Sequence, residues 1–102
     1  FSNTLNLMAM TLEEFQKLKS PQPNLSVELQ SLWYDYQGNW QKAHDLVDSL
    51  EGKNAARVHA YLHRKEGDQW NSDYWYRKAG EIRPKMTLEE EWEELTKHFL
   101  ET

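Results

Sequence analysis

The sequence predicts an all-α domain, and three features support this prediction. Apolar residues recur at the helical spacing i, i+3, i+4, i+7 in several segments. Capping residues and glycines stand where these segments begin and end. No stretch alternates between apolar and polar residues with period two, so no sheet is expected. A chain of 102 residues suffices for one domain with one core, and we expect a single all-helical domain over 1–102.

The first two predicted helices have clear start and stop signals. Thr11 and Glu14 form a capping box that opens a short helix, and Pro21 ends it. Ser26 is expected to cap the second helix, and Gly38 follows at the position where a left-handed residue is favoured. The apolar face of the second helix is Leu29, Leu32, Trp33 and Tyr36.

Two further helices are expected in the middle of the chain. Asn39 opens a helix that ends at Gly52, and Asn54 opens another that ends at Gly67. The predicted inward faces are Trp40, Ala43, Val47 and Leu50 in the first and Ala55, Val58 and Leu62 in the second.

The last two predicted helices begin at Asp68 and at Thr87. The first ends at Gly80, and the second opens with a capping box of Thr87 and Glu90. Their stripes are Ser72, Trp75, Tyr76 and Ala79 in the first and Leu88, Trp92, Leu95 and Phe99 in the second. Because the second stripe would otherwise form an exposed apolar patch, we expect the helix at 87–100 to cap the helical hairpin before it.

Composition excludes several classes of function. The chain has no cysteine, which rules out a disulfide framework, a cysteine nucleophile and a cysteine-ligated zinc site. Its longest apolar run has four residues, so no membrane partner is expected and a cytoplasmic location is the default. The chain opens with Phe1 rather than methionine. Residues 1–7 are therefore interpreted as a processed or added end without structure, with Met8 or Met10 as alternative native starts.

Charge is segregated along the chain. Residues 1–52 carry seven acids and three bases, 53–85 carry four acids and eight bases, and 86–102 carry six acids and one base. The net charge of −5 argues against a nucleic-acid partner, because nonspecific binding to nucleic acid depends on many Lys and Arg contacts with phosphates. The basic segment 53–85 still favours an anionic protein or peptide partner.

Two segments share a layout of helix, glycine turn and second helix with a small residue five positions after the glycine. These segments are Gly38-Asn39-Trp40 before Ala43 and Gly67-Asp68-Gln69 before Ser72. The layout resembles the turn of a tetratricopeptide repeat over residues 26–80, although the turn glycines are 29 residues apart where that repeat has a period of 34. The resemblance implies two degenerate antiparallel hairpins in a right-handed stack. It places small residues where paired helices meet, at Ser31, Ala43, Ala60 and Ser72.

A second likeness covers the same part of the chain. The segments in question are VHAYLHRKEGD and NSDYWYRKAG, which are similar to a group of small bacterial proteins of uncharacterised activity. This likeness implies no activity.

The register of the repeat also implies a binding surface. It places a basic set with an aromatic floor on the concave side, where repeats of this kind hold extended peptides. The set is Asn54, Arg57, Tyr61, Arg64 and Lys65, and the first hairpin offers Glu28, Leu32, Asp35 and Tyr36 at matching positions. Because Arg can hold a carboxylate through two hydrogen bonds, the leading hypothesis is a module that binds an acidic or carboxylate-bearing peptide. A solvated helix face is the alternative.

Trp70 and Tyr74 stand apart from the other aromatic residues. They share a helix face with Asp73 and Arg77 rather than with the packing stripe, so they are expected to be exposed. Partner contact and simple packing at the rim remain alternatives.

Histidines supply the one enzyme-like feature. His59 and His63 are four residues apart with Glu66 three further on, and His44 on the preceding helix could complete a metal site. The repeat register favours a packing role for the first two histidines instead. With no phosphate-binding loop and no recognisable catalytic triad, a metal-dependent enzyme is the alternative hypothesis, and no cofactor or catalytic residue is predicted.

Overall fold

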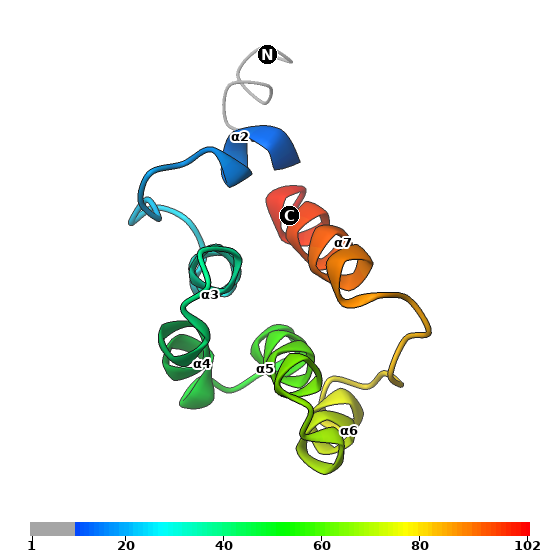
Figure 1. Ribbon diagram of the computed structural model, residues 1–102. Coiled ribbons are helices and arrows are strands. Elements are labelled where there is room, and N and C mark those ends of the chain that lie inside the picture. The colour runs from blue at the N-terminus through cyan, green and yellow to red at the C-terminus, as the bar shows by residue number, and fades with distance from the viewer. Residues whose placement is uncertain (1–9) are drawn as a thin grey trace.

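The computed structural model describes residues 10–102, and these fold into six helices without a strand, which confirms the all-α prediction. The prediction for residues 1–7 lies outside this range. The helices are α2 (Leu12–Gln16), α3 (Val27–Tyr36), α4 (Trp40–Asp48), α5 (Lys53–Glu66), α6 (Gln69–Lys78) and α7 (Leu88–Leu100) (Figure 1). Both predicted capping boxes are present, and Ser26, Asn39 and Asp68 cap α3, α4 and α6 as predicted.

The four central helices form two successive hairpins, α3 with α4 and α5 with α6, and α4 packs on α5 to join them. Helix α7 then returns along one side of this row and contacts α3 and α5, with α2 beside it (Figure 1). The buried core lies between these elements. It includes Phe15, Leu32, Val47, Val58, Leu62 and Trp92.

Small residues allow the two helices of each hairpin to approach closely. Ser31 and Ala43 are fully buried where α3 meets α4, and the Ser31 hydroxyl donates to the Ala43 carbonyl at 2.8 Å. Ser72 repeats this contact in the second hairpin, donating to the Ala60 carbonyl at 3.0 Å. Each serine hydroxyl is therefore hydrogen-bonded although it is buried, and the small side chain lets the two helices lie close together.

Three local expectations were wrong. Leu50 is 37% exposed, because α4 ends at Asp48 and residue 50 lies beyond the helix. Asn54 does not cap α5, which begins at Lys53 after Gly52. Tyr36 is exposed at the end of α3, although its ring stacks on Trp92 with centroids 4.9 Å apart.

Helix α7 hides its apolar stripe as expected, but its place differs from the one predicted. Trp92, Leu95 and Phe99 are buried. The helix packs across one helix of each hairpin, α3 and α5, rather than on the second hairpin alone. Trp92 donates its indole N–H to the Leu32 carbonyl of α3 at 3.0 Å. The apolar surface that hairpin formation leaves uncovered lies on α3 and α5, which is why the stripe docks between them.

Gly67 ends α5 in the left-handed conformation, with φ of +88°. A Cβ placed there would meet nothing within 4 Å, so substitution changes the backbone energy and not the packing. We expect Gly67→Ala to lower the free energy of unfolding by about 1 to 2 kcal/mol, measured by urea unfolding. Gly67→Asn should recover part of this loss, because asparagine tolerates the left-handed region better. An alanine variant as stable as the parent would contradict this account.

Candidate functional site

Helix α5 carries the side chains of the predicted groove on one face. Arg57, Tyr61, Arg64 and Lys65 follow at i, i+4, i+7 and i+8, which directs all four toward α3 and α7. The same residues that were expected to face a partner therefore face the rest of the chain.

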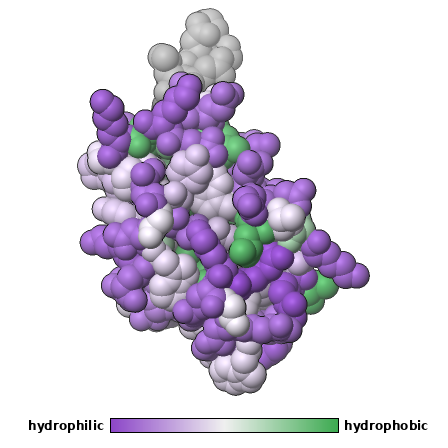
Figure 2. Space-filling model, viewed as in Figure 1, coloured by the Kyte–Doolittle hydropathy of each residue, from purple (hydrophilic) through white to green (hydrophobic). Residues whose placement is uncertain are grey.

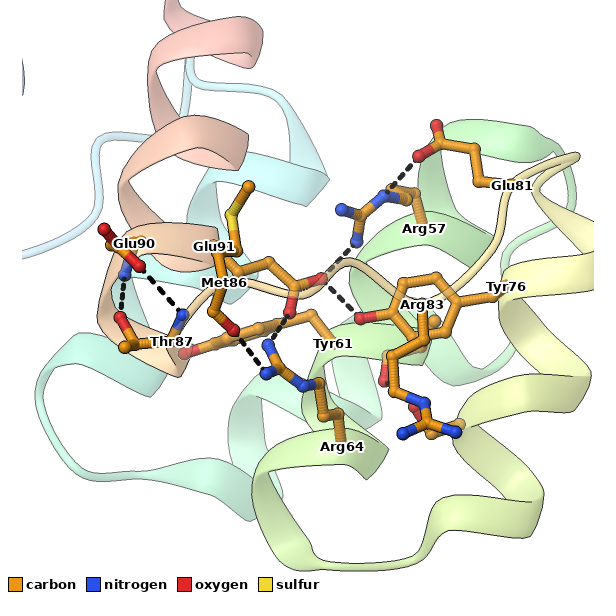
Figure 3. Close-up of polar contacts among 12 residues, drawn as sticks. Arg57, Tyr61, Arg64, Tyr76, Glu81, Arg83, Met86, Thr87, Glu90 and Glu91 are labelled. Carbon is orange, nitrogen blue, oxygen red and sulfur yellow. Dashed lines mark hydrogen bonds and ion pairs between the residues drawn. The ribbon is translucent and has the colours of Figure 1, made fainter.

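Glu91 of α7 occupies the centre of this face and is fully buried. Its carboxylate accepts from Arg57 Nη1 at 2.6 Å and from Arg64 Nη1 at 2.6 Å, and the Tyr76 hydroxyl also donates to it (Figure 3). Burial by itself would lower the pKa of Arg57, but the Glu91 carboxylate raises that pKa above its ordinary value. Burial and the hydrogen bond to Glu91 raise the pKa of Tyr76. Arg64 also donates to the Met86 carbonyl, so both arginines have buried partners.

Asp35 of α3 forms a second buried polar centre. It accepts from the Tyr61 hydroxyl at 2.7 Å and from Lys65 Nζ at 2.8 Å. Burial, followed by the Asp35 charge, raises the pKa of Tyr61. Asp35 of the first hairpin and Lys65 of the second therefore form an ion pair between the two hairpins.

The predicted open basic groove is therefore corrected. Arg57 and Arg64 are held by Glu91, so their charges are not free for a partner. Tyr61 and Lys65 still line an open pocket of about 310 Å³ together with Asp35 and Tyr36. Asn54 and Lys65 remain exposed at its edges. Helical spacing correctly grouped the residues on one face. It could not reveal that an acid 34 residues from Arg57 would cover them.

Trp70 and Tyr74 are exposed on α6, as predicted. The side chains are 73% and 36% exposed, and their rings stack with centroids 6.1 Å apart and an interplanar angle of 7°. Lys78, one turn further along, holds its ammonium 5.5 Å from the Tyr74 ring centroid. The outer face of α6 is thus aromatic with basic residues at its C-terminal end.

A basic cleft lies beside this face, between α6 and the segment 79–87. The cleft is open, has a volume of about 680 Å³, and is lined by Arg64, Asp73, Tyr76, Arg77, Glu81, Ile82, Arg83, Pro84 and Lys85. Arg83 bridges Asp73 through contacts of 3.0 and 3.2 Å. Within residues 10–102, Arg77, Lys78 and Lys85 form no ion pair.

Of the residues that line this cleft, the sequence prediction included only Arg64 among the binding residues. The excess of bases in residues 53–85 was the sequence feature that could have indicated the cleft. In the structure these bases form two groups. Both arginines of α5 form ion pairs with Glu91, whereas the bases on α6 and on the segment after it are exposed on the surface. The face shown in Figure 2 is mainly hydrophilic with small separate apolar patches, which agrees with charged side chains covering most of the molecule.

The structure brings His44 of α4 together with His59 and His63 of α5. The candidate ligand nitrogens of the three rings all lie within 4.8 Å of one another, and Nε2 of His44 is 3.0 Å from Nε2 of His59. Glu66, the fourth predicted member, does not join them directly. It contacts Nδ1 of His63 at 2.6 Å instead.

Two tryptophans enclose the histidine cluster. Trp40 stacks on His44 with centroids 4.9 Å apart, and Trp75 stacks on His59 at 4.0 Å. Burial, with smaller effects of the neighbouring His44 and His63, lowers the pKa of His59 to about 4. His59 is therefore neutral near pH 7, with a ring nitrogen able to accept a hydrogen bond or a metal.

No helix within residues 10–102 is long and apolar enough to cross a bilayer. Comparison of the chain with protein-family models, with curated proteins and with solved structures finds no match. The α6 surface and the histidine cluster are therefore the two candidate sites of this protein.

Proposed function

We propose that this protein is an interaction module that binds an acidic segment of a partner protein on the outer surface of α6 and the segment after it. The observation that supports this proposal is the basic cleft beside the exposed Trp70–Tyr74 pair. The proposed ligand, an acidic peptide segment, is the one expected from the sequence. The surface differs, because Glu91 of α7 pairs with the two arginines of the predicted groove on α5.

The charges that line the cleft favour an acidic partner. The cleft lining carries four bases, Arg64, Arg77, Arg83 and Lys85, and two acids, Asp73 and Glu81, although the whole chain is acidic. Arg64 and Arg83 already have acidic partners. The cations left for a ligand are Arg77 and Lys85, with Lys78 nearby. Arg77 is suited to a carboxylate because its planar guanidinium donates two parallel hydrogen bonds.

Exposed apolar side chains beside the cleft form the rest of the proposed binding surface. Trp70, Tyr74 and Arg77 follow at i, i+4 and i+7, so the aromatic pair leads directly to the cleft. Ile82, which lines the cleft, is 86% exposed. Exposed Trp, Tyr and Arg side chains are the types that dominate binding energy at protein interfaces. The expected ligand is therefore an acidic segment that also carries one or two large apolar side chains.

The test uses short fluorescent peptides that combine Glu or Asp with Phe or Leu, with binding followed by anisotropy. Arg77→Glu with Lys85→Glu should weaken binding at least about tenfold, because two attractive contacts become repulsive. Raising the salt concentration from about 50 to 500 mM should weaken binding to the parent protein, because exposed charges are screened.

The matched control is Lys17→Glu with Lys19→Glu, which reverses two exposed lysines near α2. This control should bind the peptides as the parent does. Equal weakening in both double variants would indicate attraction to overall charge alone, and binding insensitive to Arg77→Glu with Lys85→Glu would refute the proposed surface. Circular dichroism would verify that the variants remain helical.

A further inference from the structure

We propose that His44, His59 and His63 form a binding site for a divalent transition metal ion, with Zn²⁺ the best-matched ion. The three rings come from two helices and converge in the interior, where His59 and His63 are buried. The site shares no residue with the α6 surface of the proposed interaction, so each can fail without the other.

One ligand distance in the histidine cluster is close to that of a tetrahedral site. Zinc binds histidine nitrogen at about 2.0 to 2.1 Å, which places two tetrahedral nitrogen ligands about 3.3 Å apart. Nε2 of His44 and Nε2 of His59 are 3.0 Å apart, which is close to this value, and the ligand nitrogen of His63 lies within 4.8 Å of both. Oδ1 of Asp48 lies 3.9 Å from both of these nitrogens, on the exposed side. Asp48 stands outside the group of three residues whose ligand atoms lie within 4.8 Å of one another, so its side chain must turn inward to reach a shared ion. With this movement, we assign Asp48 as the fourth ligand.

Glu66 provides the support that a ligating histidine normally has. Metal-bound histidines usually donate the other ring N–H to a carboxylate or carbonyl, which fixes the tautomer and the ring orientation. The Glu66 carboxylate lies 2.6 Å from Nδ1 of His63, which leaves Nε2 of that ring as the metal ligand. Glu66 is therefore a positioning residue for His63.

The metal-free cluster is not a fully satisfied polar core. Nδ1 of His44 is buried and has no hydrogen-bond partner within residues 10–102. Nε2 of the same ring faces His59 and Asp48, so an ion held by Nε2 would leave Nδ1 unpaired.

The donor set selects the kind of ion. Three imidazoles and one carboxylate suit zinc and its first-row neighbours, whereas Ca²⁺ and Mg²⁺ prefer oxygen ligands only. The Trp40 and Trp75 rings stack on His44 and His59, and the three imidazoles have little contact with solvent.

The experiment uses the full chain without a histidine tag, freed of metal with a chelator. Zinc is titrated in competition with a chromophoric zinc indicator, and Co²⁺ is added separately because tetrahedral cobalt has strong visible absorption bands. We expect one equivalent of either metal. His44→Gln and His63→Gln should weaken zinc binding at least about 100-fold, Glu66→Gln about 10- to 100-fold, and Asp48→Asn at least about tenfold.

His98→Gln is the matched control, since His98 is an exposed histidine on α7 outside the cluster, and it should bind like the parent. Circular dichroism checks that each variant is folded. His44 is the most exposed ring of the three, at 17% against 11% for His63 and 2% for His59, which makes its variant the one least disruptive to folding. Absence of near-stoichiometric zinc or cobalt binding by the parent, or unchanged zinc affinity in a folded His44→Gln variant, would overturn the site. Unchanged affinity in Asp48→Asn would overturn the assignment of the fourth ligand.

Discussion

Glu91→Gln is expected to lower the free energy of unfolding by about 3 to 5 kcal/mol, the range for removing one partner of a buried ion pair. Glu91 is fully buried and accepts hydrogen bonds from Arg57, Arg64 and Tyr76. Glutamine keeps the shape of the side chain but removes the negative charge, so two largely buried guanidinium groups lose their counter-charge. Urea unfolding followed by circular dichroism would measure the change.

Glu93→Gln is the matched control, because Glu93 is an exposed residue on the same helix. Its unfolding free energy should stay within about 0.5 kcal/mol of the parent, as for most surface substitutions. A second test adds Arg57→Met to Glu91→Gln. If Glu91 is the main partner of Arg57, this second substitution should cost less in the Glu91→Gln background than in the parent. Unchanged stability of Glu91→Gln would contradict the central role of the carboxylate.

Trp92→Ala is expected to destabilise the protein by about 3 to 5 kcal/mol, the range for truncating a buried large aromatic side chain. Trp92 packs near Phe15 with ring centroids 6.1 Å apart, stacks on Tyr36, and donates its indole N–H to the Leu32 carbonyl. The substitution therefore leaves a cavity between three helices and removes one buried hydrogen bond. This loss is a large part of the total stability of a domain of this size.

Trp70→Ala is the control of the same residue type. Its ring is 73% exposed, so its thermal midpoint should remain close to that of the parent. Thermal melts of both variants and of a chain ending at residue 84 would test the role of α7. Parent-like melting of Trp92→Ala and of the shortened chain, both still monomeric, would assign the α7 stripe to an interface instead.

The features of the candidate sites that lie within one helix could be predicted from the sequence, whereas those that depend on contacts between helices could not. The spacing of His59, His63 and Glu66 on one helix was readable, and so was the exposure of Trp70 and Tyr74. The position of His44 beside His59 depends on how α4 packs on α5. The sequence indicated that His44 could join the other histidines but could not establish that it does. The pairing of Glu91 with Arg57 and Arg64 was not predicted, since an acid within the run 89–94 has the signature of a solvated helix face.

The order of residues along the chain is enough to predict the helices, most of their caps and most of the faces that are buried. Caps such as Thr11 with Glu14 and stripes such as Leu88, Trp92, Leu95 and Phe99 depend on contacts within one or two turns, so the local order of residues suffices. Only the tertiary structure decided where α7 docks, which charges it neutralises and which bases remain on the surface. Those outcomes depend on pairs such as Trp92 with Leu32, 60 residues apart. Helical periodicity shows that an apolar stripe needs a partner surface, but it carries no information about which surface that is.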